Sequence, residues 1–315
     1  MKKNYFCSEK QKHEMTNRFS LTLKFYFMKN KTILLAAFPT LAGLVAESKA
    51  NEQKRGQASL FSKPKLGYGI LTFVIVFVLN MDLNATPSTQ IWIPSTDFQA
   101  WKTLHLGIDN YLRTEKIDGV RGAGIYDIGL TTGFLPFKKF QGEIGVDYLS
   151  MGDNVYDDHP IYFNAKLGFP EGALFKNAPA IAIGAVNVGL KKNLTNYNII
   201  YGEIAKTLPI VGRLSIGYYT GNEKILVDEN LKKANSGLLV SWDRAMPEIS
   251  DKLWLAIDYQ GGKNSFGALN VGFSWAFSKN VSVICGYDFY NNKKAYYNMN
   301  NQNANSFTTQ LDINF

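Results

Sequence analysis

Acidic side chains recur at every second position in several segments of this 315-residue chain. In one such segment Glu143 and Asp147 share one parity, whereas Ile144, Val146 and Tyr148 occupy the other. This two-residue period is typical of a strand with one polar face and one apolar face. Carboxylates collected on one face of a sheet can line a water-filled path, or they can form an ion network with nearby bases.

A second candidate for chemistry is His159, which directly follows Asp157 and Asp158. An acid–acid–His cluster could bind a metal ion or serve in hydrolysis, and it is equally the composition of a solvated loop. We find no phosphate-binding glycine loop, no paired-cysteine zinc pattern and no Gly-x-Ser-x-Gly motif. Cys7 and Cys285 are the two cysteines, and they are far apart in the sequence. We therefore expect no cofactor and no metal.

The charge of the chain is unevenly distributed. The net charge is +8, yet residues 1–85 hold 13 Lys+Arg and 5 Asp+Glu, so residues 86–315 hold 21 of each. A basic surface that follows phosphates would need its positive surplus in the body of the protein. The sequence therefore gives no support to a nucleic-acid partner.

Residues 1–85 resemble a leader with an export signal. The apolar run Leu66–Leu79 follows Lys63 and Lys65, and Ala85 offers a small residue at which cleavage is expected. A second signal-like segment begins at Met28, so either the start of the chain is overlong or the leader is compound. The alternative is an uncleaved inner-membrane anchor.

The alternating period predicts about twelve strands after residue 102. Their expected spans are 103–112, 122–134, 140–150, 160–169, 179–189, 197–206, 213–220, 236–244, 252–260, 267–277, 281–290 and 305–315. In the fifth strand the apolar parity changes near Ala185 and Val186, which predicts a β-bulge there.

The connections between these strands tend to alternate between long and short. Long ones include Met151–His159, Gly221–Asn235 and Asn291–Ala304, whereas Ser278–Asn280 is a tight turn. Long loops at one end and short turns at the other are typical of an outer-membrane barrel and not of a soluble sandwich. Pro170–Ala178 is an exception, because it is long where a short turn is expected.

The last strand carries a more specific signal. Leu311, Ile313 and the C-terminal Phe315 share one face, and this pattern resembles the sorting signal of bacterial outer-membrane β-barrel proteins. The resemblance implies an all-β, transmembrane, antiparallel up-and-down barrel in the outer membrane of a Gram-negative-type bacterium. It also implies two partners, outer-membrane lipid and the barrel assembly machinery. Aromatic residues near the expected strand ends fit interfacial girdles.

We therefore divide the chain into a leader (1–85), a periplasmic lead-in (86–102) and an outer-membrane β-barrel (103–315). The lead-in contains two prolines and lacks alternation. Its sequence leaves a second arrangement open, in which the segment tucks into the barrel as a plug.

If the apolar face meets lipid, the polar face lines the interior of the barrel. The candidate lumen-lining residues are Asp109, Asp127, Glu143, Asp147, Lys166, Glu203, Arg213, Asp243, Asp258 and Asp288. On the same parity Asp312, Arg113 and Arg121 also face inward, and His105 is a further candidate.

This acidic excess favours a porin-like channel for small solutes with a preference for cations. The alternative is a structural or surface-interaction barrel with a closed lumen, in which the Asn-rich tract Asn291–Ala304 with Tyr296 and Tyr297 binds a partner. An outer-membrane hydrolase is less well supported, since the His-x-Ser pattern of barrel deacylases is absent at His105. We therefore expect no enzyme.

Overall fold

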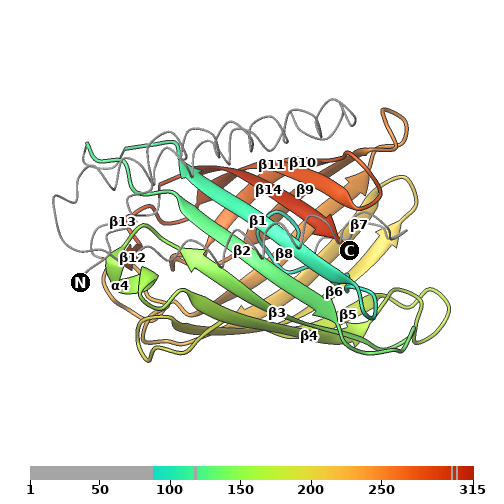
Figure 1. Ribbon diagram of the computed structural model, residues 1–315, viewed down its shortest axis with the longest axis horizontal. Helices are drawn as coiled ribbons and strands as arrows, with labels where there is room; N and C mark the ends of the chain where they lie inside the picture. Colours follow the sequence, from blue (N-terminus) through green and yellow to red (C-terminus); the bar gives the residue numbers. More distant parts are fainter. Residues whose placement is uncertain (1–87, 117–118, 299–300, 303) are drawn as a thin grey trace, which may run out of the picture. The chain divides into compact units, whose positions relative to one another are not determined.

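The computed structural model describes residues 88–116, 119–298, 301–302 and 304–315 (Figure 1). These belong to the second of two compact units of the chain, residues 62–315. The predicted leader, with its apolar run Leu66–Leu79 and the expected cleavage after Ala85, lies outside the described residues. Within the described part, no helix is long and apolar enough to cross a membrane.

Twelve strands close into one antiparallel barrel, which confirms the predicted fold class (Figure 1). Consecutive strands are hydrogen-bonded to each other, and β1 pairs with β14 to close the ring. The barrel strands are β1 (Leu104–Arg113), β2 (Ile125–Gly133), β3 (Gln141–Ser150), β4 (Ile161–Phe169), β5 (Ala180–Gly189), β6 (Asn196–Leu208), β7 (Gly212–Thr220), β8 (Ser236–Ala245), β9 (Leu253–Gln260), β10 (Ala268–Ala276), β11 (Val281–Tyr290) and β14 (Ser306–Asn314).

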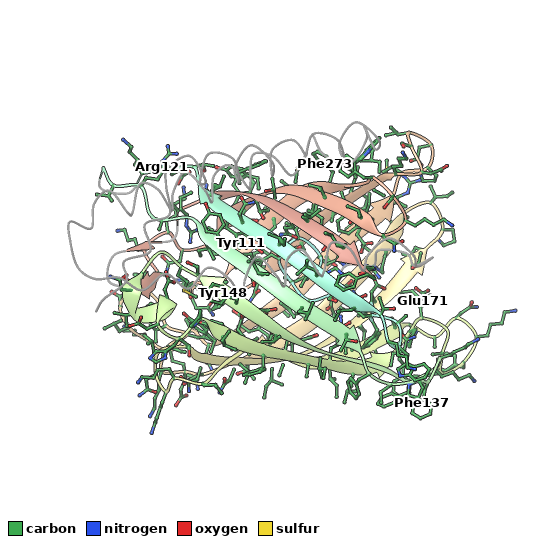
Figure 2. All side chains as sticks on the ribbon, in the orientation of Figure 1. Tyr111, Arg121, Phe137, Tyr148, Glu171 and Phe273 are labelled. Atoms are coloured by element: carbon green, nitrogen blue, oxygen red, sulfur yellow. The ribbon has the colours of Figure 1, made fainter. Side chains whose placement is uncertain are left out.

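The outer surface of the barrel is apolar, as the alternating pattern predicts. Ile144, Ile183, Ile216 and Phe273 point outward, and more than two fifths of each is exposed. Closure pairs the backbone groups of every barrel strand with its neighbours, which is the condition for strands to cross a hydrocarbon layer. The large outward side chains are distributed around the whole ring (Figure 2).

The two ends of the barrel differ. One end, here the turn end, carries the connections 134–140, 170–179, 209–211, 246–252 and 277–280 together with the C-terminus. The other, the loop end, carries 114–124, 151–160, 190–195, 221–235, 261–267 and 291–305. Figure 2 shows Phe137 and Glu171 at the turn end and Arg121 at the loop end.

Some local features were not predicted. The loop after β3 contains the short helix α4 (Asn154–Asp157), and the loop after β11 contains the small hairpin of β12 (Tyr296–Asn298) and β13 (Asn301–Gln302). Arg121 does not face the lumen, because β2 begins only at Ile125 and leaves Arg121 exposed in the preceding loop.

The predicted bulge in β5 is present. The register between β5 and β6 shifts between Val186 and Val188, and Asn187 between them has a φ of 53°. The backbone N–H of Asn187 donates to Oδ1 of Asn164 on β4, at 3.0 Å. The bulge therefore ties a loop-end section of β5 to a side chain inside the barrel.

The interior is less uniformly polar than the alternation suggested. A buried apolar and aromatic cluster includes Tyr197, Ile199, Tyr201, Leu239 and Phe266. In β8 both Leu238 and Leu239 are apolar, and only Leu239 is buried. Alternation alone could not assign such runs to one face.

Candidate functional site

A hairpin formed by residues 88–99, here the lumen hairpin, lies inside the barrel. The two arms are joined by a hydrogen bond from the backbone N–H of Ser95 to the carbonyl of Ser88, at 3.1 Å. The turn is closed by a hydrogen bond from the N–H of Gln90 to the carbonyl of Ile93, at 2.8 Å. Its tip carries Ile91 and Trp92. The structure thus places most of the expected lead-in within the lumen, the arrangement that the sequence left open as a plug.

The tip of the lumen hairpin is held by one carboxylate of the barrel wall. Oδ2 of Asp258 on β9 accepts hydrogen bonds from the backbone N–H groups of Ile91 and Trp92, at 2.7 and 3.0 Å. From β14, three strands further along the ring, Nε2 of Gln310 donates to the carbonyl of Ile91 at 2.7 Å. These contacts satisfy tip groups that would otherwise be buried without partners.

The barrel wall also makes room for the tip. Gly272 and Gly286 are cross-strand partners on β10 and β11. A Cβ at Gly286 would stand 3.0 Å from Cγ2 of Ile91, and one at Gly272 would stand 3.1 Å from its Cδ1. The two glycines therefore form the seat of Ile91.

Near the turn end, a buried ion pair is hydrogen-bonded to both arms of the lumen hairpin. Nζ of Lys166 lies 3.0 Å from Oε1 of Glu143 and donates to the carbonyls of Ser88 and Ser95, at 3.1 and 3.0 Å. The second carboxylate oxygen of Glu143 accepts from Gln99 N at 2.8 Å. The hydrogen bonds that this pair makes beyond its own contact thus all go to the hairpin.

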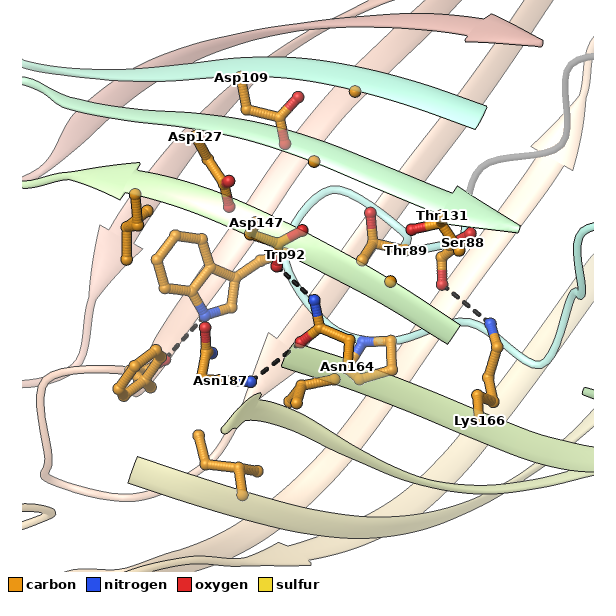
Figure 3. A pocket seen from close by; sticks show the side chains of 18 of the residues that line it. Ser88, Thr89, Trp92, Asp109, Asp127, Thr131, Asp147, Asn164, Lys166 and Asn187 are labelled. Carbon is orange, nitrogen blue, oxygen red and sulfur yellow. Dashed lines mark hydrogen bonds between the residues drawn. The ribbon is translucent and has the colours of Figure 1, made fainter. Parts of the chain in front are cut away.

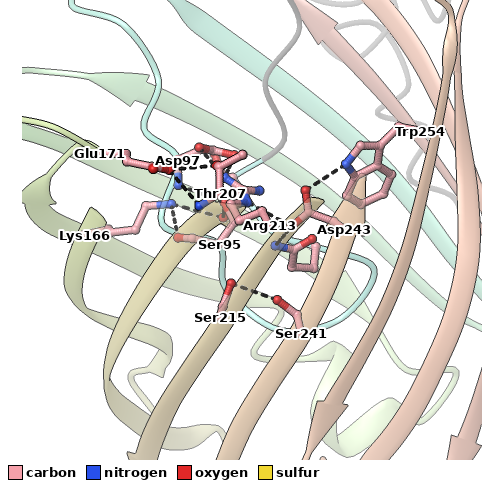
Figure 4. Close-up of polar contacts among 12 residues, drawn as sticks. Ser95, Asp97, Lys166, Glu171, Thr207, Arg213, Ser215, Ser241, Asp243 and Trp254 are labelled. Atoms are coloured by element: carbon pink, nitrogen blue, oxygen red, sulfur yellow. Dashed lines mark hydrogen bonds and ion pairs between the residues drawn. The ribbon is translucent and has the colours of Figure 1, made fainter. Parts of the chain in front are cut away.

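A second ion cluster holds the hairpin on the opposite side (Figure 4). Arg213 on β7 contacts both carboxylate oxygens of Asp97, each at 2.7 Å, and its Nε donates to Asp243 at 2.9 Å. Asp243 also accepts from Gln90 and from the indole N–H of Trp254, each at 3.1 Å. Arg213 therefore bridges the hairpin and the wall.

The lumen hairpin does not fill the barrel. A cavity of about 210 Å³, here the passage, remains between it and the wall (Figure 3). The wall of the passage is formed mainly by β1 to β5, with further residues from β6 to β9 and β14. On β3 and its end the passage is lined by Glu143, Gly145, Asp147, Leu149 and Met151. At about 3.3 Å per residue, the distance from Glu143 to Met151 is about 26 Å along the strand. The cavity therefore follows β3 from near the turn end to the loop end.

One wall of the passage carries three aspartates without a basic partner, here the aspartate row. Asp109 and Asp127 are direct cross-strand partners on β1 and β2, and Asp147 lies on β3 diagonally from Asp127. No Lys, Arg or His of the described residues lies within ion-pair distance of any of them. The two bases on the passage are already paired, Lys166 with Glu143 and His105 with Asp312 at 3.3 Å.

The ten candidate lumen residues all lie on inward-facing positions and fall into two groups. Five of them border the passage: Asp109, Asp127, Glu143, Asp147 and Lys166. The other five lie away from it: Glu203, Arg213, Asp243, Asp258 and Asp288. Of this second group Arg213, Asp243 and Asp258 bind the hairpin, whereas Asp288 accepts from Ser306 Oγ at 2.6 Å. Strand parity identified the inward face, and it could not distinguish these two environments.

The three residues of the expected sorting signal lie at the seam of the barrel. Leu311 pairs with Ile108, and Ile313 pairs with Leu106. Phe315 is 6% exposed, and its backbone N–H and C=O exchange hydrogen bonds with Leu104 at 2.9 and 2.8 Å. The C-terminal residue thus helps to close the ring.

The described histidines do not form a nucleophile–base pair. The carboxylate of Asp312 lies between His105 and Ser282, so the serine hydroxyl meets the carboxylate and not the imidazole. His159 is exposed, and the nearby Asp157 accepts from Met151 N at 2.7 Å. Among the residues that the structure describes, no group of three His, Cys, Asp or Glu side chains could hold a metal ion.

Comparisons with known proteins find similar folds and no family. No family model matches the sequence, and no curated protein matches it. Solved outer-membrane barrels are similar at low scores. A NanC porin has a TM-score of 0.42 at 10% identity, over 67% of this chain and 98% of that one. A KdgM porin has 0.42 at 11% identity, over 67% and 99%, and an outer membrane channel from Pseudomonas putida F1 has 0.40 at 11%, over 71% and 100%. These values are too low to assign the chain to a family or to transfer a solute to it.

Proposed function

We propose that this protein is a porin-like channel of the bacterial outer membrane that passes small solutes, with a preference for cations. The observation that carries the proposal is the passage beside the lumen hairpin, which follows β3 over most of the barrel. An apolar outer surface and a closed ring of strands fit a bilayer environment.

The preference for cations follows from the charges along the passage. Glu143 and Asp312 are balanced by Lys166 and His105. In the aspartate row, Asp109 shares the influence of His105, whereas no base of the described residues acts on Asp127 or Asp147. Rings or rows of carboxylates raise the local concentration of cations and oppose anions. The cavity of about 210 Å³ restricts the path to small solutes.

Conductance in planar bilayers tests this function. We expect small, discrete channels with a cation-selective reversal potential in a KCl gradient. The triple variant Asp109→Asn, Asp127→Asn, Asp147→Asn should lower the cation-over-anion permeability ratio several-fold. Asp251→Asn is the control, because it removes one carboxylate charge from an exposed residue of the turn end. Anion preference in the wild-type protein would contradict the proposal.

A closed structural barrel is the second candidate, and the lumen hairpin is the observation that favours it. The hairpin is fixed by two ion clusters and the Asp258 contacts, as expected if it permanently fills the lumen of the barrel. This candidate predicts a folded, membrane-inserted protein without measurable conductance. The same bilayer experiment therefore separates the two functions.

A further inference from the structure

The aspartate row contains carboxylate oxygens that no protein group satisfies. Oδ1 of Asp127 is buried and accepts no hydrogen bond from the residues that the structure describes. No hydrogen bond from that part of the chain reaches Asp109 either, although Asp109 borders the passage. Buried carboxylates are normally paired or hydrogen-bonded. Both side chains face the passage, so their remaining hydrogen bonds are available to water or to a solute there.

The third member of the row is held in a fixed orientation. Nδ2 of Asn164 donates to Oδ2 of Asp147, and Oδ1 of Asn164 accepts from the backbone of Asn187 at the β5 bulge. This chain of contacts fixes which end of the amide faces the carboxylate. Asp147 keeps its other oxygen for a solute, beside Asp127 (Figure 3).

An aromatic ring lines the same passage as these carboxylates. It is the indole of Trp92 at the hairpin tip, which is drawn with Asp127 and Asp147 in Figure 3. Its N–H donates to the carbonyl of Phe266 at 3.0 Å, and Tyr111 and Tyr290 pack edge-on at centroid distances of 5.1 and 5.8 Å. The ring is therefore rigidly placed. Carboxylates beside an aromatic face are the combination that recognises organic ammonium groups.

We propose that the passage binds a small organic dication, a short aliphatic diamine, with its ammonium groups on Asp127 and Asp147 and its methylenes against Trp92. The inference rests on the proposed function, since it names the solute class of the same passage. Three carboxylates without an ion-pair partner favour more than one positive charge, and a cavity of about 210 Å³ limits the molecule to a short chain.

Calorimetric titration of the detergent-solubilised protein with 1,4-diaminobutane tests the site independently of conductance. We expect saturable binding of the diamine and none of butane-1,4-diol, which has the same chain length without charge. Loss of a charged hydrogen-bond partner is worth about tenfold in affinity or more, so Asp127→Asn and Asp147→Asn should each weaken binding at least about tenfold. Asp251→Asn should bind like the wild type.

The contribution of the ring is tested separately. Trp92→Phe should retain part of the affinity, whereas Trp92→Leu should lose about fivefold or more, because only the aromatic variants keep a π face. Folding of each variant is checked by its β-sheet circular dichroism. If one substitution of Trp92 prevents folding, the other is used for the comparison with the wild type.

The outcomes separate this site from the channel function. Conductance without diamine binding overturns the site and leaves the channel proposal standing, whereas binding without conductance supports the site and overturns the channel. Equal binding of the diol, or displacement of the diamine by an equimolar amount of Ca²⁺, also overturns the site. In the bilayer, the diamine should interrupt the wild-type current in a concentration-dependent way.

Discussion

The ammonium of Lys166 lies 3.0 Å from the carboxylate of Glu143, and 3% and 7% of the two side chains are exposed. This pair connects neighbouring strands β3 and β4, yet its remaining hydrogen bonds all go to the lumen hairpin. This one buried charge pair of the wall therefore makes three hydrogen bonds to the hairpin inside it.

Removing one partner of this pair should loosen the hairpin. Lys166→Met leaves Glu143 buried without its cation, and we expect a loss of about 3–5 kcal/mol in the free energy of unfolding. The double variant Lys166→Met, Glu143→Gln should recover a large part of that loss, because no charge is then stranded. Urea unfolding in detergent measures the free energy of unfolding of the wild type and of each variant. Additive losses in the double variant would contradict a direct pair.

The same loosening should be visible in the channel. If the hairpin restricts the passage, Lys166→Met should give larger or noisier single-channel currents than the wild type. A conductance identical to that of the wild type, in a folded variant, would show that this contact does not limit the path.

Asp258 provides a local test at the hairpin tip. Asp258→Ala leaves the N–H groups of Ile91 and Trp92 without their acceptor, which should cost about 1–3 kcal/mol. Hydrogen exchange of the peptide containing these two amides should be faster by a factor of ten or more. Exchange in β3, which Asp258 does not contact, serves as the internal reference. Unchanged protection at the tip would contradict the assigned contact.

Packing of the tip against the wall predicts a rescue experiment. Gly286→Ala places a Cβ 3.0 Å from Ile91 Cγ2 and 3.1 Å from Thr308 Cγ2, so we expect a loss of about 1–3 kcal/mol from overpacking. Adding Ile91→Ala removes the group that is crowded and should restore part of the stability. If the double variant were as unstable as the sum of both single variants, Ile91 would not occupy this seat in solution.

The long connection between β4 and β5 is tethered at Glu171, outside the barrel wall. Glu171 pairs with Lys206 at 2.7 Å and accepts from the N–H and hydroxyl of Thr207. Its slight burial acts to raise the pKa of Glu171, but the hydrogen bonds from Lys206 and Thr207 outweigh it and hold the pKa below its ordinary value.

This direction fixes the sign of the pH dependence. Because the folded state binds its proton less readily, the tether stabilises the fold fully above the ordinary glutamate pKa of about 4.3, and is lost as the pH falls through the lowered value. Glu171→Gln should therefore cost at most about 1 kcal/mol at pH 7 and nothing at the acid end of the titration. Urea unfolding at both pH values, with Asp251→Asn as control, measures the difference. A larger effect in acid than at pH 7 would contradict the assignment.

The strands of the barrel could be predicted from the sequence because the pattern that specifies each strand is local. Alternation in segments such as Gln141–Ser150 specifies a strand and its lipid-facing side, and each predicted strand overlaps one strand of the barrel. The parity change near Val186 likewise marked the bulge at Asn187. These features depend on neighbouring residues only.

The lumen hairpin depends on distant residues, and its place could not be derived in the same way. Its partners Lys166, Asp258 and Gln310 are between 71 and 219 positions away from the groups that they bind. The one local signal is the run Ile91–Ile93, three large apolar residues in an otherwise polar segment. Such a run requires burial, and in a barrel whose outside is formed by strands the interior is the nearest place for it.

The fold-back of the lumen hairpin has a mechanical consequence. Both of its arms point to the turn end, so a force applied to the chain before Ser88 in that direction would peel the contacts one after another. The bond from Ser88 to Lys166 would break first, then the one from Gln90 to Asp243, and then the pair at Asp258. The contacts of the second arm, such as Asp97 with Arg213, would break last. Sequential rupture of this kind needs less force than shearing all contacts at once. The extracted segment would stay attached to β1 at Leu104, within reach of its seat.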